Sequence, residues 1–444
     1  MTFLRVWLLV FLVAGCSERS NECHADSDCT NLAFPFCDVD GEYAAAGGVK
    51  NVCTITPPDC KPERCGCTPN ATTCTDGSLS VCNADGRSTT ETACVLGCAP
   101  DNSRCAMFAP SNGLADALAM AAAEQDVEFP SIAAVLDTGE IHEDQTGVQT
   151  HVKSLLVSQV GVPSIRVYVA RSFKIHGALV IANVSSSHPI AFVASGPITI
   201  DGAFDAAIDA NHTFGPGGQP SGAPCTGGVD GRGGGGGGNG TAGGRGAPAA
   251  VIPPAPGAEG GPAQPMAIFE PLVGGCFGGD GMDPNSGGAG GAGIQFVSLT
   301  SITVAAGGVV NVGGHGGGDD AGGGAGGTVL FEAPALTIDG KVTANGGSGG
   351  ACGSNGSNAT ADATAAPRVG GCTSTNGVGA AYSGAGGTGT AAPGDGLADT
   401  GSPRGGGGGG AVGRVEVKTA DGTYAHGASS IVSAKISAGM LAPK

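Results

Sequence analysis

A block of 15 residues with a fixed pattern of hydrophobic and polar positions recurs along the chain. Its four clear copies begin at Ile165, Ile190, Ile294 and Thr328, and a more divergent fifth copy begins at Val415. In almost every copy, hydrophobic residues occupy the first, third, ninth and eleventh positions, and a glycine usually occupies the thirteenth. Hydrophobic residues at every second position are typical of a strand with one buried face. Each copy therefore predicts two short strands and a turn.

Alternation places five residues of each of the first two copies on the buried face. They are Ile165, Val167, Phe173, Ile175 and Leu179 in the first copy, and Ile190, Phe192, Ile198, Ile200 and Phe204 in the second. These copies start 25 residues apart, within the range of about 20 to 50 residues that indicates a repeat array. Stacked copies would pair every backbone N–H and C=O at a strand spacing of about 4.8 Å. The sequence therefore predicts an all-β fold, a right-handed parallel β-helix (a solenoid) over residues 151–444.

Glycine-rich inserts separate the later copies of the repeat. They cover about residues 205–293, 313–327 and 343–410. One interpretation is flexible loop, because glycine loses more backbone entropy on ordering than any other residue. The other is an ordered bundle of extended left-handed helices, whose backbones approach closely because no side chain separates them. Each long insert carries two cysteines, Cys225 with Cys276 and Cys352 with Cys372. A disulfide in each insert would offset part of the ordering cost, which favours the bundle.

Composition and charge narrow the range of partners. The 444 residues include 85 Gly and 27 Pro, a share at which low-complexity composition begins. The formal net charge is -18, from 38 acidic and 20 basic residues. Such a chain repels phosphate backbones and lacks the attraction that drives nucleic-acid binding. Nucleic acid is therefore not expected as a partner.

The N-terminus predicts export and a lipid anchor. Residues 1–15 contain one early cation, Arg5, and an apolar run too short to span a membrane, which is typical of a signal peptide. The run ends in LVAGC, which resembles a bacterial lipobox and would make Cys16 the lipidated residue. The alternative is a plain signal peptide followed by an unrelated cysteine. Acyl chains, at about 0.8 kcal/mol per buried methylene, would anchor residues 16–22 as a tether. We expect the protein on the cell outer membrane, exposed at the surface.

The cysteines after Cys16 fall into groups of even size. In an exported chain, even numbers at close spacing indicate disulfides, and here they define two small modules, residues 23–53 and 60–105. The candidates are Cys23, Cys29, Cys37, Cys53, Cys60, Cys65, Cys67, Cys74, Cys82, Cys94, Cys98, Cys105, Cys225, Cys276, Cys352 and Cys372. Zinc is the alternative for close pairs such as Cys65 with Cys67, but an oxidising compartment and few nearby histidines favour disulfides. No metal site is predicted, and the disulfide pairing is left open.

Residues 106–150 are predicted to connect the modules to the repeats. The stretch SNGLADALAMAAAEQD indicates an alanine-rich helix of about three turns, capped by Ser111 or Asn112. Apolar segments at residues 132–136 and 155–160 predict strands that lead into the first copy.

Two residue sets suggest hydrolytic chemistry. Asp137 and Asp399 each begin an Asp-Thr-Gly triplet, as in aspartic proteases, but the sequence around both favours turns. His315, Asp319 and Asp320 resemble part of the polygalacturonase residue set, in which paired carboxylates supply a general acid and activate water. Here they stand in a different order inside a glycine tract, so they are candidates only and no catalytic residue is predicted.

Two further patterns suggest binding sites. Residues 278–283 fit the start of a calcium-binding nonapeptide, but no second copy follows, so calcium is only a candidate and no cofactor is predicted. Stacking of the first two copies would place His176 beside Asp201. That pair indicates either a site or the Asp-Gly chemistry of a tight turn, and we expect the turn.

Taken together, the lipobox, the cysteine-rich modules and the ITIDG-type strands interrupted by GGxGG inserts resemble a group of exported glycine-rich lipoproteins of myxobacteria. The resemblance covers nearly the whole chain and implies a surface location and a β-helical fold, with no assigned activity. Copy three departs from the pattern, with Ala306 in place of the turn glycine.

The sequence therefore predicts a non-enzymatic cell-surface lipoprotein with a structural or adhesive role. Its expected partners are the membrane, through the lipid anchor, and extracellular matrix, polysaccharide or a neighbouring cell surface. The alternative is a surface β-helix hydrolase or lyase that acts on polysaccharide.

Overall fold

The computed structural model divides the chain into two compact units, Met1–Ala106 and Met107–Lys444. It describes residues 23, 28–29, 36–38, 51–54, 67–84, 88–94, 96–99, 101–129, 133–135, 141–143, 149–150, 152–181, 188–207, 215–219, 222–229, 233–248, 257–265, 269–281, 286–370, 380–398 and 405–442. The predicted signal peptide, lipidated Cys16 and tether lie outside these residues, as do Cys60, Cys65 and Cys372.

The described residues of the first unit form two small antiparallel sheets. β1 (Phe36–Asp38) pairs with β2 (Val52–Thr54), and β4 (Ser78–Cys82) pairs with β3 (Thr72–Thr75) and β5 (Thr89–Ala93). The described disulfides are Cys23–Cys37, Cys29–Cys53, Cys67–Cys82, Cys74–Cys98 and Cys94–Cys105. Each closes a loop of 11 to 24 residues, a constraint that contributes about 2–4 kcal/mol in such small modules. The prediction of disulfides is confirmed for these cysteines.

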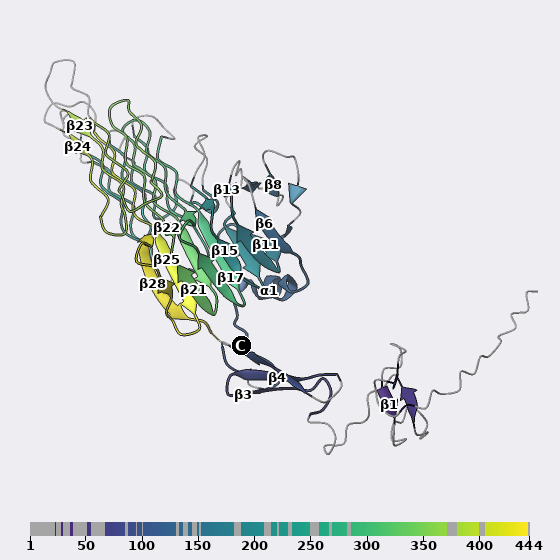
Figure 1. Cartoon of the computed structure of the whole chain (residues 1–444). Coiled ribbons are helices and arrows are strands. Elements are labelled where there is room, and N and C mark those ends of the chain that lie inside the picture. The colour runs from purple at the N-terminus through teal and green to yellow at the C-terminus, as the bar shows by residue number, and fades with distance from the viewer. Residues whose placement is uncertain are drawn as a thin grey trace, which may run out of the picture. The chain divides into compact units, whose positions relative to one another are not determined.

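Three sheets form the body of the second unit (Figure 1). The first sheet contains, in spatial order, β10 (Lys153–Val157), β11 (Ile165–Ala170), β14 (Ile190–Ala194), β17 (Gly293–Ser298), β20 (Thr328–Glu332), β25 (Arg414–Thr419) and β28 (Lys435–Met440). The second contains β26 (Ala425–His426), β21 (Ala335–Ile338), β18 (Ser301–Val304), β15 (Ile198–Ile200), β12 (Ser172–Ile175) and β6 (Asp126–Phe129). The third contains β27 (Ile431–Ser433), β22 (Lys341–Thr343), β19 (Val309–Asn311), β16 (Ala203–Asp205), β13 (Ala178–Ile181), β7 (Ala133–Val135), β8 (Ile141–Glu143) and β9 (Gln149–Thr150).

The predicted all-β, right-handed parallel β-helix is wrong as a fold class. The first and third sheets mix parallel and antiparallel pairs, because β10 runs antiparallel to β11 and β8 runs antiparallel to β7 and β9. The copies of the repeat do pair in parallel with one another, but they do not follow each other as closed turns. After each of β16, β19 and β22 the chain leaves the sheets through a glycine-rich insert before it returns to the first sheet. The 25-residue period of the first two copies is therefore not maintained.

An aromatic stack fills the core between the sheets. Tyr168, Phe192, Phe296 and Phe331 lie on successive strands of the first sheet with ring centroids 5.4 to 5.6 Å apart. Phe173 of the second sheet meets Phe192 edge-on at 5.3 Å. All five side chains are buried, and offset stacked and edge-to-face pairs add to the free energy of burial.

The first strand of copy one differs by one residue from the predicted alignment. Tyr168, not Val167, pairs with Phe192, so the core receives Tyr168 while Ile165 and Val167 point to the opposite face. The corner between β11 and β12 is one residue shorter than the corner between β14 and β15. Tyr168 therefore lies one residue closer along the chain to Phe173 than Phe192 lies to Ile198. Ile165 and Val167 are still buried, on the strand that helix α1 (Ala115–Ala121) contacts.

The turn glycines form a hydrogen-bonded column. The N–H of Ala203 donates to the carbonyl O of Gly177 at 2.9 Å, and the same pattern continues with acceptors Gly202, Gly308 and Gly340. In copy three the equivalent acceptor is Gly308, two residues after Ala306, because the turn in that copy is longer. A Cβ on Gly202 would overlap the carbonyl O of Gly177, which explains why this column needs glycine.

Residues before the first repeat also pack on the sheets. α1 is shorter than predicted, because Asn112 and Gly113 have positive φ values of 60° and 71° and form a separate 3-10 turn, Ser111–Gly113.

Among the described residues, no helix is long and apolar enough to cross a membrane.

A buried polar network holds the 3-10 turn on the first sheet. The Glu332 carboxylate accepts from the Ser111 hydroxyl at 2.6 Å and from the Gln295 amide at 2.7 Å, and Lys418 Nζ lies 3.5 Å away. Burial raises the pKa of Glu332, although its hydrogen bonds and the charge of Lys418 act to lower that pKa.

We expect Phe192→Ala to lower the free energy of unfolding by about 3–5 kcal/mol, because it leaves a cavity at the centre of the aromatic stack. Urea unfolding followed by far-UV circular dichroism measures the change. Tyr382→Ala removes an aromatic ring that is 39% exposed and should cost less than about 1 kcal/mol. Equal losses in the two variants would contradict the assigned core.

Candidate functional site

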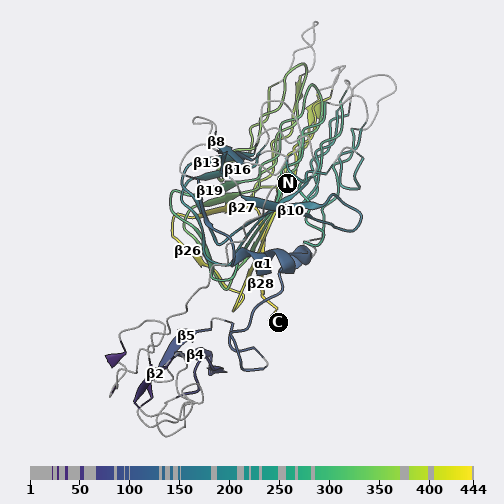
Figure 2. The ribbon, with the colours of Figure 1, turned by 90° about the vertical axis from the view of Figure 1, so that its right-hand side faces the viewer.

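The glycine-rich inserts form an ordered bundle of extended segments, here called the glycine bundle (Figures 1 and 2). Its described segments are 225–228, 233–240, 243–247, 257–264, 274–281, 287–291, 312–317, 320–327, 344–350, 384–387 and 406–413. They run side by side away from the sheets and are joined by backbone hydrogen bonds between segments. The prediction of an ordered bundle rather than flexible loops is confirmed for these residues.

Hydrogen bonding in the bundle repeats every three residues. The N–H groups of Gly234 and Gly237 donate to the carbonyl oxygens of Asp320 and Gly323 at 2.8 and 2.9 Å. The intervening residues face other neighbours. Segment 233–240 is hydrogen-bonded to six other segments: 225–228, 243–247, 257–264, 274–281, 320–327 and 406–413. A repeat of three residues without internal hydrogen bonds is the geometry of an extended polyproline-II-type helix.

Close packing in the bundle leaves no space for side chains at its centre. A Cβ added to Gly236 would overlap the carbonyl O of Gly409, and one added to Gly322 would overlap the carbonyl O of Gly235. Because these contacts are to backbone atoms, no side-chain rotation could relieve them. The glycine composition is therefore a packing requirement of the bundle interior.

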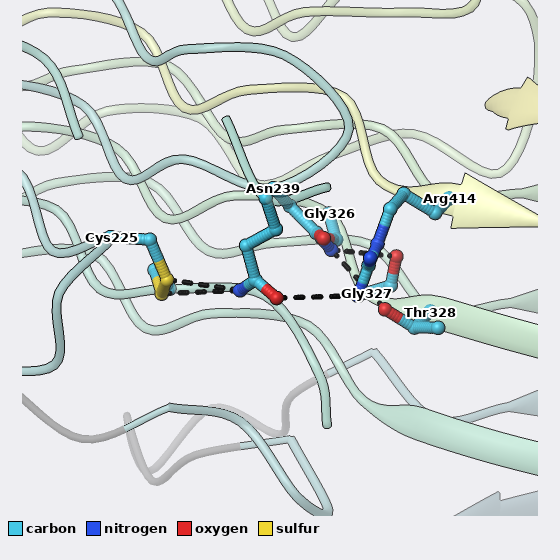
Figure 3. Close-up of a disulfide and its surroundings, with 8 residues drawn as sticks. Cys225, Asn239, Gly326, Gly327, Thr328 and Arg414 are labelled. Carbon is cyan, nitrogen blue, oxygen red and sulfur yellow. Dashed lines mark hydrogen bonds between the residues drawn. A yellow bond between two sulfur atoms is a disulfide. The ribbon is translucent and has the colours of Figure 1, made fainter. Parts of the chain in front are cut away.

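Polar side chains join the base of the bundle to the first sheet (Figure 3). The amide of Gln264 donates to Cys225 Sγ at 3.0 Å, beside the Cys225–Cys276 disulfide. The Gln264 carbonyl O accepts from the Arg414 guanidinium at 3.3 Å. Asn239 donates to the carbonyl oxygens of Gly326, at 2.6 Å, and Gly327.

His315, the candidate histidine of the polygalacturonase-like set, lies in a cavity on the bundle. His315 lines a space of about 440 Å³ together with Phe277, Ser286, Asn355 and Asn358. Its Nδ1 lies 2.9 Å from the carbonyl O of Gly316. Neither Asp319 nor Asp320 lines this cavity.

The two candidate aspartates, Asp319 and Asp320, accept hydrogen bonds from a turn. Asp319 accepts a hydrogen bond from the N–H of Gly353, and Asp320 accepts one from the N–H of Cys352 at 2.6 Å. Asp320 is fully buried and has a φ of 58°. The structure therefore does not assemble His315 and the two carboxylates into one cavity. The aspartates instead accept hydrogen bonds from the backbone of the loop at residues 352–353.

The remaining predicted binding patterns have local structural roles where they are described. His176 Nδ1 lies 2.7 Å from an Asp201 carboxylate oxygen, so the expected juxtaposition is present. In the calcium-type motif, Asp280 accepts from the N–H of Gly287 at 3.0 Å, while the last two residues of the motif lie outside the described residues, as do Asp137 and Asp399.

The described cysteines do not offer free ligands at the one cluster with metal-like geometry. The sulfur atoms of Cys23, Cys29 and Cys53 lie within 4.8 Å of one another, but each is in a disulfide. Cys352 is disulfide-bonded as well.

Sequence reasoning missed Gln264 and Arg414. Arg414 stands directly before the hydrophobic positions of the fifth copy, where a cation facing outward is unremarkable in sequence. Its burial involves contacts with Gln264, Pro265 and Phe269, which no local pattern indicates.

No protein-family model matches the chain, and no match was found among curated proteins or solved structures.

We expect Gly236→Ala to destabilise the second unit by about 3 kcal/mol, because its methyl group would press against a backbone carbonyl at the bundle centre. Gly370→Ala is the matched control, since a Cβ there meets no atom within 4 Å. Urea unfolding compares the two. A Gly236→Ala variant as stable as the control would contradict the tight packing of the bundle.

Proposed function

We propose that this chain is a non-enzymatic cell-surface lipoprotein with an adhesive or structural role, and that the glycine bundle presents its contact surface. The observation that carries the proposal is the hydrogen-bonded, closely packed bundle. Such a body is rigid, because each inner segment is fixed on all sides by backbone hydrogen bonds. Rigid presentation reduces the entropy lost when a surface makes many weak contacts.

The positions of Asp319 and Asp320, the candidate catalytic carboxylates, favour this function over polysaccharide cleavage. Asp319 and Asp320 accept hydrogen bonds from the turn at Cys352 and Gly353. Paired catalytic carboxylates need to flank a substrate. The negative charge of the chain also disfavours an acidic polysaccharide as substrate.

The proposed location rests on the N-terminal pattern. A signal peptide over residues 1–15 and lipidation of Cys16 would place the protein on the outer membrane, facing matrix, polysaccharide or neighbouring cells. The similarity to glycine-rich myxobacterial lipoproteins agrees with this location and adds no activity.

Lipidation is tested by metabolic labelling with palmitate. We expect the label to disappear in Cys16→Ser, because the acceptor thiol is lost, and to remain in the neighbouring control Ser17→Ala. An immunoblot confirms that both variants are produced. Label that persists in Cys16→Ser would show that the anchor is elsewhere or absent.

Adhesion is tested with beads coated with the purified protein and offered to cells or cell-surface polysaccharide. We expect Gly236→Ala to reduce retention by at least about tenfold relative to Gly370→Ala, because it disrupts the bundle interior. Circular dichroism checks that the sheets stay folded in both. Equal retention by the two variants would mean that the bundle is not the contact surface.

The enzymatic alternative is tested by incubating the protein with polyuronates. New reducing ends that disappear in Asp319→Ala plus Asp320→Ala would overturn the proposal in favour of cleavage.

A further inference from the structure

The cavity of about 440 Å³ on the glycine bundle has both polar and aromatic walls. Its volume lies within the range of about 300–1,000 Å³ that is typical of small-molecule sites. The side chains of Phe277, Ser286, His315, Asn355 and Asn358 line it, and the remaining lining residues are glycines and one alanine. These residues come from three parts of the chain that are far apart in sequence, so the cavity exists only because the inserts pack together.

The lining side chains are accessible from solvent. Asn355 and Asn358 are exposed, and Phe277, Ser286 and His315 are half-buried. A ligand can therefore reach them while the close backbone packing of the bundle stays as it is.

Hydrogen bonds to the backbone fix the walls of the cavity. The N–H of Gly316 donates to Asn358 Oδ1 at 3.1 Å, and the N–H of Gly318 donates to the carbonyl O of Ser286 at 2.6 Å. His315 Nδ1 donates to the carbonyl O of Gly316 at 2.9 Å, because a carbonyl oxygen can only accept. Groups that are held in place before a ligand binds lose less entropy on binding.

The chemistry of the lining matches a neutral polar ligand with an apolar face. A carboxamide, such as those of Asn355 and Asn358, offers both donors and an acceptor, as do the neighbouring hydroxyl groups of a sugar. The ring of Phe277 offers an apolar surface with a negative face, against which the C–H groups of a sugar ring can pack.

Charged ligands fit this lining less well. Apart from His315, none of the described lining residues can carry a charge. An ionised ligand would lose hydration without gaining a fixed counter-charge. The net charge of -18 adds long-range repulsion against acidic polysaccharides.

We propose that this cavity binds a pyranose unit of a neutral polysaccharide. The C–H face of the sugar packs on the Phe277 ring, and its hydroxyl groups exchange hydrogen bonds with the Asn355 carboxamide and accept from the Asn358 NH2 group. The inference rests on the proposed adhesive function, for which it names the class of ligand.

The test uses the full chain with Cys16→Ser, so that no sugar-based detergent is needed. Ligand-observed NMR titration compares four neutral tetrasaccharides, namely maltotetraose, cellotetraose, mannotetraose and tetraacetylchitotetraose, with the acidic tetragalacturonate, the cationic chitotetraose and adenosine. We expect at least one neutral tetrasaccharide to bind about tenfold or more tightly than each of the other three ligands. No binding of any neutral tetrasaccharide, or equal affinity for a charged one or for adenosine, would overturn the proposal.

Variants locate the binding. Asn355→Ala removes an exposed carboxamide, and Phe277→Leu keeps an apolar side chain but removes the ring. Each should lower the affinity for the tetrasaccharide by about fivefold. Ser354→Ala is the matched control, since Ser354 is exposed, adjacent and outside the lining, and it should bind like the parent. If Phe277→Leu does not fold, Asn355→Ala decides. Unchanged affinity in a folded variant would refute the site.

The bead assay separates this site from the adhesive role. Binding of a neutral tetrasaccharide by a protein whose beads are not retained would refute the adhesive role and keep the sugar site. Retention that is lost in Gly236→Ala but unchanged in Asn355→Ala would keep the adhesive role of the bundle and refute this cavity as its sugar site.

Discussion

Direct contact between backbones is the constraint on which the second unit depends. At the centre of the glycine bundle, segments lie so close that a single methyl group would overlap a neighbouring carbonyl oxygen. Close approach lets each N–H and C=O reach a different neighbour in turn, so hydrogen bonding takes over the organising role that apolar side chains have in an ordinary core. Glycine loses much backbone entropy on ordering, and dense hydrogen bonding opposes that cost.

Neighbouring segments are aligned by different interactions in the sheets and in the bundle. In the sheets, large side chains such as Phe192 and Phe296 fill the core and set the register through their contacts. In the bundle, successive glycines are chemically identical and contain no such information. Alignment therefore has to come from the ends of the segments, where 287–291 continues into β17 and 406–413 continues into β25. The Cys225–Cys276 disulfide and the Asn239 amide add fixed points at the same base.

How much the sequence could predict depended on how local the determining interactions were. Alternating hydrophobic residues predicted the repeated strands, and even cysteine numbers predicted disulfides. The register of β11 was wrong by one residue because a corner of different length cannot be recognised from apolar spacing alone. The closed solenoid was wrong because the antiparallel strands β8 and β10 come from segments outside the repeat. The candidate grouping of His315 with Asp319 and Asp320 assumed that residues close in sequence share a cavity, whereas Asp320 accepts a hydrogen bond from the N–H of Cys352, 32 residues further along.

The threefold periodicity of the bundle also limits how its segments can change in length. Adding one glycine to an inner segment would rotate every later residue onto a different neighbour, whereas adding three would advance the segment by one full turn, about 9 Å, with each face preserved. Segments that remain attached to strands at one end could therefore grow or shrink outward in whole turns. A chain built in this way could vary how far its outermost loops stand from the sheets while the sheets themselves stay unchanged.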